Sequence, residues 1–349
     1  MQQVAEIAAP ITPSAALRRV AFYMERSRAG SYRVDAFRKA LATVRELGDD
    51  AVAGLVADGT LTDVPGIGPS TAEVISQAVA GGLPSRLATL QANAAAPLEE
   101  GGAELFAQVR GDCHLHSDWS DGGSPIDEMV LTAVELGHEW MVLTDHSPRL
   151  KVANGLSPTR LRRQIGLIDQ INTALGASFT LLKGIEVDIL DGGELDQEPD
   201  LLDELDLVTA SVHSKLRMAN KPMTERMLAA VRTPRVNVLG HCTGRLVEGS
   251  RGTRPQSEFD AEAVFTACVE NDVAVEINSR PERCDPPDEL ITLALDLGCL
   301  FAIDSDAHAP GQLEMKRYGC ARAERLGVPA ERIVTTWPVE RLLAWSRAR

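Results

Sequence analysis

Histidine and carboxylate side chains that could bind metal ions recur through the last two thirds of this sequence. They begin in the stretch GDCHLHSDWSDG (residues 111–122), where His114 and His116 are two residues apart and Asp121 follows in a turn. Because side chains alternate between the two faces of a strand, His114 and His116 point to one side and Cys113 to the other. Two imidazoles and a carboxylate that converge at the end of a strand could therefore begin a metal site.

Each later apolar run of strand type also ends in residues of this kind. Six of the seven histidines in the chain follow such runs, and three carboxylates accompany them. The candidate ligands are His114, His116, Asp121, His146, Glu186, His213, His241, Asp306 and His308. Since about four ligands satisfy a structural zinc ion, this set indicates two or three divalent ions that share a bridging carboxylate. Imidazole and carboxylate without thiolate suit Zn²⁺, Mn²⁺ or Fe, and exclude an iron–sulfur cluster.

Other polar residues in these segments are expected to have other roles. His138 lies in a helix–strand turn and is expected to be a surface or packing residue. Cys113 and Cys242 adjoin candidate ligands, but strand alternation turns them toward the core. Four further carboxylates either orient the ligand histidines or serve ordinary buried hydrogen bonds: Asp145, Asp188, Glu276 and Asp304.

The elements that must position these ligands are strands and helices in alternation. Strand-type apolar runs cover residues 109–116, 140–146, 179–189, 207–213, 236–241, 273–278 and 300–306. Helical segments follow several of them, at 126–136, 161–175, 224–231, 258–270 and 288–297. This alternation indicates a parallel β/α architecture, and strands that each lead into a polar loop favour a barrel over an open sheet. In a barrel the chemistry gathers at the C-terminal ends of the strands.

Residues 14–90 have a different, wholly helical pattern. Within it, the sequence LTDVPGIGPSTAEVI predicts a tight glycine hairpin followed by a helix that begins at Pro69. Gly66, Gly68 and Ser70 would present backbone amides to a phosphate at this helix start. The element resembles a helix-hairpin-helix motif, which holds DNA backbones without reading sequence, although a glycine hairpin can also serve packing alone. Residues 1–13 are expected to be a flexible lead-in, and residues 91–108 a linker.

Composition limits the possible classes of protein. The formal net charge of −15 argues against a protein that coats nucleic acid, although residues 12–90 carry nine basic and eight acidic residues and so are nearly neutral. The six cysteines are scattered without a C-x-x-C pair, which indicates reduced thiols in a cytoplasmic protein. We expect no secretory signal and no membrane span, because no long apolar run occurs.

The ligand motifs together resemble the PHP (polymerase and histidinol phosphatase) domain, over roughly residues 110–340. The resemblance rests on HLHSDWSDG and on five short motifs that follow in order: TDHS, GIE, SVHS, LGH and SDAH. More narrowly, the region is similar to the PHP domain at the C-terminus of bacterial family X DNA polymerases, including Gly244-Arg-Leu and the stretch INSRPER that ends at Arg283. Residues 14–90 resemble the small DNA-binding domain that begins those polymerases.

This resemblance implies a distorted (β/α)7 barrel, spanning residues 109–349, with a trinuclear metal centre. One ion would be held by His114, His116, Glu186 and Asp306. A second would be held by Glu186, His213 and His241, with Glu186 bridging. The third would be held by Asp121, His146 and His308.

The chemistry expected of such a centre is phosphoester hydrolysis by a metal-bridging hydroxide. Arginines suit the phosphate charge outside the metals, so the candidates for substrate contact are Arg283, Arg280, Arg245 and Lys215, unless they pair with surface carboxylates instead. The chain has no room for a polymerase palm, so DNA synthesis is not expected. The helix at 70–80 has no Lys or Arg, which argues against a 5′-phosphate lyase pocket.

The leading functional hypothesis is a DNA-processing phosphoesterase: a 3′–5′ exonuclease, a 3′-phosphatase or an abasic-site endonuclease. The alternative is a small-molecule phosphatase acting on histidinol phosphate or a nucleotide monophosphate, because the nearly neutral N-terminal region would bind DNA weakly. A third hypothesis, a non-catalytic DNA-binding scaffold, predicts that some metal ligands have been lost. All nine positions keep a ligating residue type, which argues against this hypothesis.

Overall fold

Two units, each with its own hydrophobic core, make up the described chain. The structure is a computed structural model that describes residues 10–249 and 252–348. It divides between Leu98 and Glu99, inside the segment predicted to be a linker. Most of the predicted lead-in at residues 1–13 lies outside the described residues. No helix in the described ranges is long and apolar enough to cross a membrane.

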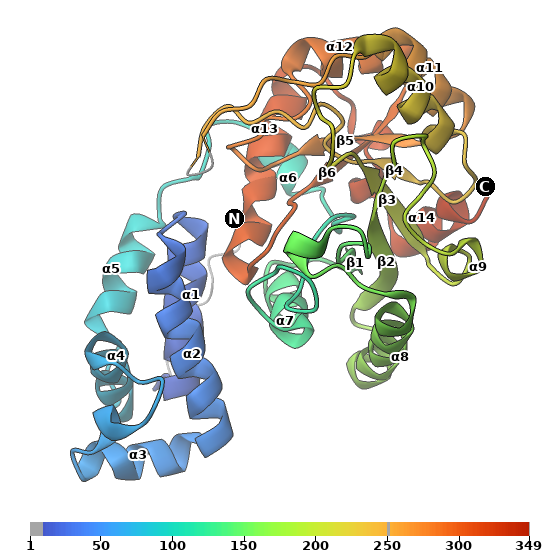
Figure 1. Cartoon of the computed structure of the whole chain (residues 1–349). Coiled ribbons are helices and arrows are strands. Elements are labelled where there is room, and N and C mark those ends of the chain that lie inside the picture. Colours follow the sequence, from blue (N-terminus) through green and yellow to red (C-terminus); the bar gives the residue numbers. More distant parts are fainter. Residues whose placement is uncertain (1–9, 250–251, 349) are drawn as a thin grey trace. The chain divides into compact units, whose positions relative to one another are not determined.

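The first unit is helical, as the apolar spacing of residues 14–90 predicts. Its buried side chains, such as Leu17, Val20 and Ile75, recur at helical spacing and form one cluster. Thr12 caps the first helix by accepting a hydrogen bond from the Ala15 amide. The elements, labelled in Figure 1, are α1 (Pro13–Arg26), α2 (Ser31–Leu47), α3 (Asp49–Ala57), η1 (Leu61–Asp63), α4 (Pro69–Val79) and α5 (Ser85–Asn93).

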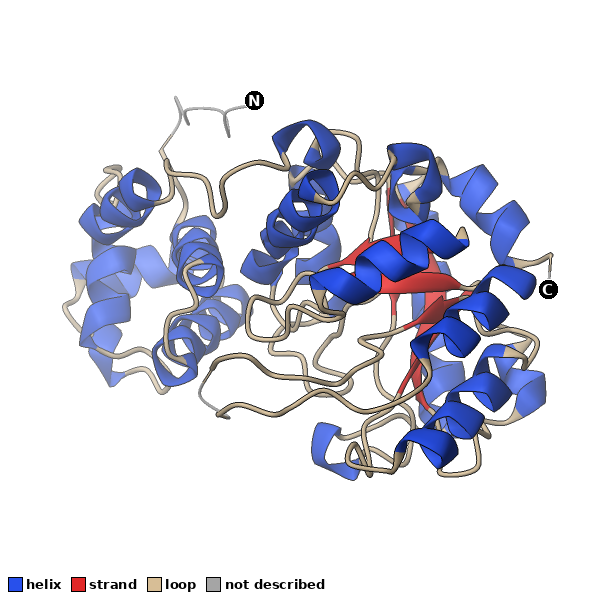
Figure 2. Cartoon of the chain, turned by 90° about the horizontal axis from the view of Figure 1, so that it is seen from above, coloured by secondary structure: helices blue, strands red, loops and turns tan. Residues whose placement is uncertain are grey.

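The second unit is built on six parallel strands that pair in chain order. Figure 2 shows these strands flanked by helices. The strands are β1 (Trp140–Leu143), β2 (Thr180–Asp188), β3 (Leu207–Ser211), β4 (Val238–Leu239), β5 (Ala274–Asn278) and β6 (Leu300–Asp304). The α-helices are α6 (Ala103–Phe106), α7 (Ile126–Glu135), α8 (Pro158–Leu175), α9 (Pro199–Leu202), α10 (Asn220–Val231), α11 (Ala261–Glu270), α12 (Asp288–Leu297), α13 (Lys316–Arg325) and α14 (Val339–Ser346). Short 3₁₀ segments are η2 (Lys151–Ala153), η3 (Pro310–Met315), η4 (Ala330–Arg332) and η5 (Val334–Thr336).

Side-chain alternation along β2 shows how the sheet separates core from site. Ile185 and Val187 belong to the largest apolar cluster, whereas Glu186 between them points to the opposite face, toward the histidines. Gly184 is required for close packing, because a Cβ there would lie 2.4 Å from a methyl group of Val142. The strand thus directs the Glu186 carboxylate toward the histidines, while Ile185 and Val187 pack in the apolar cluster on its other face.

The predicted first strand, at residues 109–116, is not a regular strand. Several of its amides bond side chains instead of a neighbouring main chain: Cys113 N donates to Asp304 Oδ1 (2.8 Å), and Leu115 N to Thr144 Oγ1 (2.9 Å). The segment still connects the two edges of the sheet, since the Leu115 carbonyl accepts from Thr144 and Leu115 forms a parallel bridge with Ala307. It therefore closes the barrel as an irregular seventh member.

The predicted linker also differs from the structure, because it contains α6. This short helix packs against α13 and belongs to the second unit. Leu105 is buried in that unit's core, and the Gly102 amide donates to Glu324 at 2.5 Å. The polar and glycine-rich composition of residues 91–108 did not reveal these contacts.

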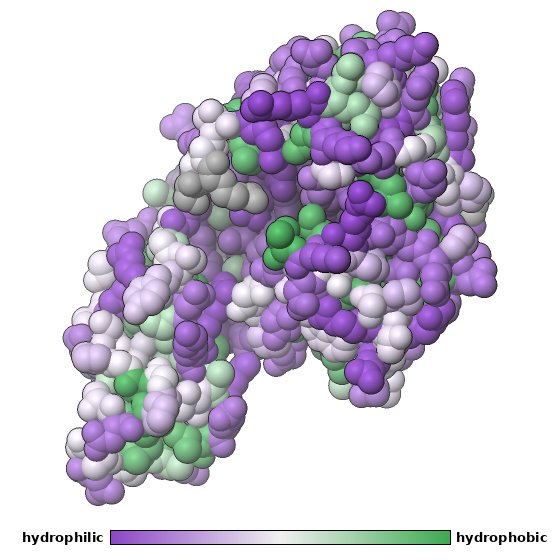
Figure 3. All heavy atoms as spheres, in the orientation of Figure 1, coloured by the Kyte–Doolittle hydropathy of each residue, from purple (hydrophilic) through white to green (hydrophobic). Residues whose placement is uncertain are grey.

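The surface of the chain is mostly polar on the face that Figure 3 shows. Large apolar side chains that are exposed, such as Val152 and Tyr32, are scattered along the chain. Single exposed apolar residues are ordinary in proteins, so they indicate no docking surface.

Candidate metal centre

The nine predicted ligands lie at or just beyond the C-terminal ends of the strands or the closing segment. The regular strands end earlier than predicted: β1 stops at Leu143 and β6 at Asp304, so that His146 and Asp306 follow the strands on loops. Asp306 adopts a left-handed backbone conformation (φ 49°), which turns the chain between β6 and His308. The strands thus set the positions of the ligands, and the loops aim their side chains.

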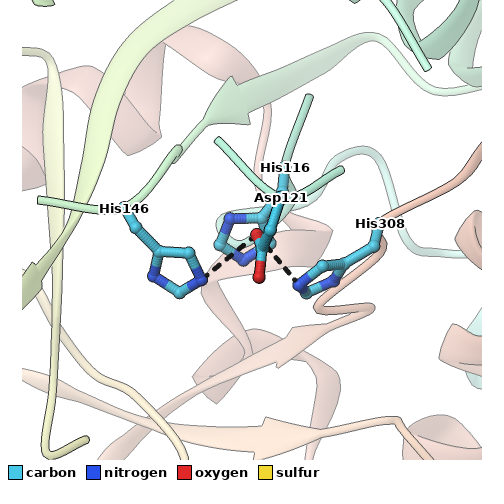
Figure 4. A group of neighbouring side chains, drawn as sticks. All are labelled: His116, Asp121, His146 and His308. Atoms are coloured by element: carbon cyan, nitrogen blue, oxygen red, sulfur yellow. Dashed lines mark ion pairs between the residues drawn. The ribbon is translucent and has the colours of Figure 1, made fainter. Parts of the chain in front are cut away.

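Asp121, His146 and His308 form one group, shown in Figure 4. Asp121 Oδ1 lies 3.4 Å from His146 Nε2 and 3.4 Å from His308 Nε2. The His116 ring lies beside this group, with its centroid 4.4 Å from that of His146 and 4.3 Å from that of His308. The ligand atoms of these four residues lie within 4.8 Å of one another, which allows one ion to reach all of them.

Glu186 joins the remaining histidines through its two carboxylate oxygens. Oε1 faces His241 Nε2 at 2.9 Å and His213 Nε2 at 3.1 Å. Oε2 faces His146 Nδ1 at 2.7 Å and His114 Nε2 at 3.3 Å. One carboxylate therefore has a histidine group on each oxygen, as a carboxylate that bridges two ions requires.

Asp306 completes the cluster on the side of His116. Its Oδ1 lies 3.6 Å from His116 Nε2. Its Oδ2 accepts hydrogen bonds from Arg283 Nε and Asn278 Nδ2, both at 3.0 Å. Those two contacts leave Oδ1 directed at the imidazole, so Asp306 can offer one oxygen to an ion.

The donor atoms fit divalent metal ions. Six imidazoles and three carboxylates supply nitrogen and oxygen ligands, the set that Zn²⁺, Mn²⁺ and Fe accept. Buried nitrogens and oxygens within the cluster have no hydrogen-bond partner among the described residues: His114 Nε2, both ring nitrogens of His116, His213 Nε2 and both oxygens of Glu186. Buried polar atoms rarely lack partners, so these facing atoms fit the role of ligands to metal ions.

Electrostatics within the protein alone divide the histidines into two kinds. Burial would lower the pKa of His146, but Glu186 and Asp121 outweigh it and raise that pKa to about 10. Burial together with the neighbouring His308 and His146 holds the pKa of His116 well below its usual range. Burial would raise the pKa of Glu186, yet His213, His114 and His146 lower it, so this carboxylate is ionised. Metal ions would replace these internal ion pairs.

The four accompanying carboxylates have two different roles. Glu276 Oε1 lies 2.6 Å from His114 Nδ1, and Asp188 Oδ1 lies 3.3 Å from His213 Nδ1, so these two orient ligand rings. Asp145 instead accepts from Ser117, Ser120 and Gln164, and Asp304 accepts from the Cys113 amide. Asp145 and Asp304 therefore hold the closing segment and the loop after it.

Asn278 is a residue of the centre that sequence reasoning did not single out. It ends β5, two residues after Glu276, and its amide donates to Asp306 Oδ2. Its position at a strand end, on the same face as Glu276, was the signal that could have identified it.

The predicted substrate-contacting cations mostly bond to the protein. Arg283 is buried and holds Asp306, while Arg280 pairs with Glu282 and places Nη1 3.0 Å from His308 Nδ1. Arg245 donates to the main-chain carbonyls of residues 283 and 284. Lys215 is largely exposed and pairs with Asp191. Arg280 is thus the predicted cation that contacts a candidate ligand histidine directly.

Of the residues predicted to contact DNA, Gly66 and Gly68 lie in the hairpin between η1 and α4, and Ser70 lies in α4 itself. Gly66 has φ 93°, a conformation that glycine adopts without strain, and a Cβ there would lie 2.8 Å from Thr43 Oγ1. The Gly68 amide donates to Thr71 Oγ1 as the cap of α4, so it is engaged within the protein. Ser70 is exposed in the first turn of α4.

The three residues that were predicted not to bind metal lie in the core. His138 is a packing residue: Lys316 Nζ lies 2.9 Å from its Nε2, and both side chains are buried. Cys113 packs with Trp140 in one apolar cluster, and Cys242 belongs to another. Burial raises the pKa of both thiols well above the usual range, which disfavours the thiolate form that binds metal.

Residues 112–280, which hold seven of the nine ligands, match the PHP domain family, and residues 13–83 match the helix-hairpin-helix domain family. The chain carries a PHP domain.

Curated proteins are similar to this chain over part of its length. The DNA polymerase/3′-5′ exonuclease PolX of Bacillus subtilis is 37% identical over 220 residues, which cover 63% of this chain and 38% of PolX. The chain therefore spans well under half the length of that relative. The probable phosphatase YcdX of Escherichia coli is 25% identical over 249 residues, covering 68% of this chain and 94% of YcdX.

Among solved structures, the histidinol phosphate phosphatase of Lactococcus lactis is similar at a TM-score of 0.45 and 18% identity, covering 62% of this chain and 92% of that one. That structure is described as a complex with zinc, L-histidinol and phosphate.

Proposed function

We propose that this chain is a metal-dependent phosphoesterase that processes DNA, as a 3′–5′ exonuclease, a 3′-phosphatase or an abasic-site endonuclease. The observation that carries the proposal is the Glu186 carboxylate, which has histidine groups on both of its oxygens. The helix-hairpin-helix domain and the likeness to a protein named as a 3′-5′ exonuclease support DNA as the substrate.

We assign three ions to the centre. His114, His116, Glu186 and Asp306 would hold the first; Glu186, His213 and His241 the second; and Asp121, His146 and His308 the third. The closeness of His116 to the third group supports a compact cluster in which neighbouring ions share ligands. When bound, such ions supply an activated hydroxide and neutralise phosphoryl oxygens.

The chain's own residues hold these ligands in place. Glu276 keeps His114 turned so that Nε2 faces Glu186, and Asp188 does the same for His213. Arg283 and Asn278 fix Asp306 from one side. Ligands held by a second set of hydrogen bonds need little reorganisation during reaction, which is the protein's contribution to catalysis.

A small-molecule phosphatase is the second candidate, and the charge of the first unit favours it. Residues 12–90 carry nine basic and eight acidic side chains, and α4 has no cationic residue between positions 70 and 79. Phosphate contacts by cations supply most of the affinity for DNA, so this unit would bind DNA weakly. The relatives named as probable phosphatases support the same candidate.

A parallel assay separates the two candidates. The Mn²⁺-loaded protein is incubated with 3′-labelled DNA and, separately, with histidinol phosphate and nucleotide monophosphates. Fast turnover of the small esters without turnover of DNA would refute the DNA proposal. Glu186→Gln should abolish either activity, because an amide offers one acceptor oxygen where two ions need one each. Glu198→Gln, which alters an exposed carboxylate paired with Arg162, serves as the matched control.

Cysteine chemistry supports a cytoplasmic location. All six cysteines are free, and five of them are buried. Free thiols persist in a reducing compartment, so we propose that the protein acts in the cytoplasm.

A further inference from the structure

Two chain segments that carry four of the candidate ligands pair side by side and form a seam in the barrel. They are residues 112–116, which close the barrel, and residues 304–308, which begin at the end of β6. The ligands that they carry are His114, His116, Asp306 and His308. The Asp306 amide donates to the His114 carbonyl at 2.9 Å, and Figure 4 shows one histidine from each segment within a single ligand group. The geometry of the centre therefore depends on the register of the seam.

Two carboxylates fasten the seam. Asp112 Oδ1 accepts hydrogen bonds from the amides of His114 and Ser305, both at 3.2 Å. Asp304 Oδ1 accepts from the Cys113 amide at 2.8 Å. Each segment thus places a carboxylate on a main-chain donor of the other segment. Since both carboxylates are fully buried, solvent does not compete for these amides.

The protein interior beside the seam contains several negative charges. Asp112, Asp304 and Glu276 are all fully buried, and the charges of Asp112 and Glu276 both act on Asp304. Asp112 Oδ2 has no hydrogen-bond partner among the described residues. Because a buried carboxylate is unfavourable unless it is paired, Asp112 requires a counter-charge.

Lys316, the first residue of α13, supplies this counter-charge. Its side chain is fully buried, and its Nζ lies 3.5 Å from Asp112 Oδ2. Nζ also donates to the Gly111 carbonyl and lies beside His138 Nε2, both at 2.9 Å. The described chain shows no second Lys or Arg paired with Asp112. Lysine and aspartate are almost never fully buried unless they are paired, so each of these two charges accounts for the burial of the other.

We infer that Lys316 is a positioning residue of the metal centre and acts through Asp112. The positive charge of Lys316 holds the Asp112 carboxylate in place, and that carboxylate holds the amides of His114 and Ser305. Without the lysine, Asp112 would be an unpaired buried charge, and it would turn away from the seam toward water or another donor. The inference rests on the proposed metal-dependent function, to which it adds a residue that binds neither metal nor substrate.

The assigned ions should depend on the seam to different degrees. The first ion takes ligands from both segments of the seam. The second ion, assigned to Glu186, His213 and His241, takes none from either segment. Loss of Lys316 should therefore weaken the first ion and leave the second unchanged.

The test measures the affinities of the full chain for Mn²⁺ and Zn²⁺ by competition with a chromogenic chelator. Lys316→Met keeps an unbranched side chain and removes its charge. The affinity for the weakened ion should fall by at least about tenfold, the low end of the range for outer partners of metal ligands. At least one ion should bind as tightly as in the wild type. A folded Lys316→Met protein that binds every ion with wild-type affinity would overturn the inference.

A double substitution separates positioning from packing. Asp112→Asn removes the charge that Lys316 balances and keeps an oxygen that can accept the two amides. Adding Lys316→Met to Asp112→Asn should lower metal affinity by no more than about twofold further, the scatter expected where no interaction is left to lose. A further tenfold loss would show that Lys316 acts independently of Asp112 and would refute the inference. This comparison holds even if Lys316→Met alone does not fold.

Two controls accompany these variants. His138→Gln alters the other side chain beside Lys316 Nζ and leaves Asp112 unchanged, so its metal affinity should equal that of the wild type. A loss as large as that of Lys316→Met would instead assign the effect to packing around the lysine. Lys221→Met removes an exposed positive charge paired with Glu225 and should have no effect on metal affinity.

Failure of this inference can be distinguished from failure of the proposed function. A wild-type protein that binds metal but hydrolyses no phosphoester would contradict the proposed function, while its affinities still test Lys316. A wild-type protein that binds no metal would overturn both.

Discussion

Glu276→Gln tests whether metal affinity depends on a residue that binds no metal. The Glu276 carboxylate is fully buried on β5. Its Oε1 lies 2.6 Å from His114 Nδ1, while its Oε2 accepts from the His241 amide (2.5 Å) and from Asn278 Nδ2 (3.3 Å). A glutamine side chain keeps the shape but has one acceptor oxygen, so either the His114 ring or the His241 amide must face an NH₂ group.

The structure sets the size of the expected effect. A hydrogen bond to a charged group contributes about 1.5–3 kcal/mol. At about 1.4 kcal/mol for each factor of ten, losing one such bond lowers the metal-binding constant by about 10- to 100-fold. This agrees with the loss of about 10- to 100-fold known for outer partners of metal-binding histidines.

Competition with a chromogenic chelator measures the affinity for Zn²⁺ or Mn²⁺ directly, apart from activity. Glu139→Gln is the matched control, because that carboxylate is 50% exposed and pairs with Arg110. A folded Glu276→Gln protein that binds metal as tightly as the wild type would refute the argument that Glu276 orients His114.

Three further predictions concern the metals, protons and hairpin. Removal of metal with a chelator should lower the unfolding midpoint of the second unit by roughly 5–10 °C, as measured by calorimetry. An ion at about 100 times its Kd stabilises the folded state by about 2.7 kcal/mol, and each kcal/mol shifts the midpoint of a unit of this size by about 2–4 °C. The unfolding transition of the first unit should not move. Metal uptake at pH 7 should release at least one proton, because the pKa of His146 is raised to about 10 without metal and the ion needs the neutral ring. Metal affinity should accordingly rise as the pH increases from 7 toward 10, and uptake without proton release in a weakly buffered indicator solution would contradict this assignment. Gly66→Ala should weaken binding to duplex DNA and lower the unfolding midpoint of the first unit, because the φ of 93° at Gly66 and the 2.8 Å approach of Thr43 Oγ1 disfavour a side chain. Gly54→Ala, on α3 with no atom within 4 Å of the added Cβ, is the control. Equal effects of the two substitutions would refute the role of the hairpin.

The candidate ligands could be located from the sequence because each lies near the end of an apolar run. Alternation along β2 placed Glu186 opposite Ile185 and Val187, and the structure confirms the separation. The parallel α/β architecture and the helical first unit follow from the same periodicities. The local sequence pattern is enough to predict a residue's role where that role depends on which face of a strand the residue occupies.

Contacts between distant residues were not predictable in this way. The segment at 109–116 reads as a strand, but its amides bond Asp304 and Thr144, whose approach depends on the whole barrel. The α6 helix is stabilised by α13, far along the chain.

The closing segment also has a consequence for the order of folding. Cys113 bonds Asp304 across a separation of 191 residues, and the Asp306 amide bonds the carbonyl of His114. The first and last ligands of the centre therefore meet only when both ends of the barrel have been synthesised and joined. Closing so long a loop is a late event for a chain that emerges from its N-terminus. A nascent chain that has not yet reached His308 therefore lacks the full set of candidate ligands, and it cannot hold metal as the finished unit would.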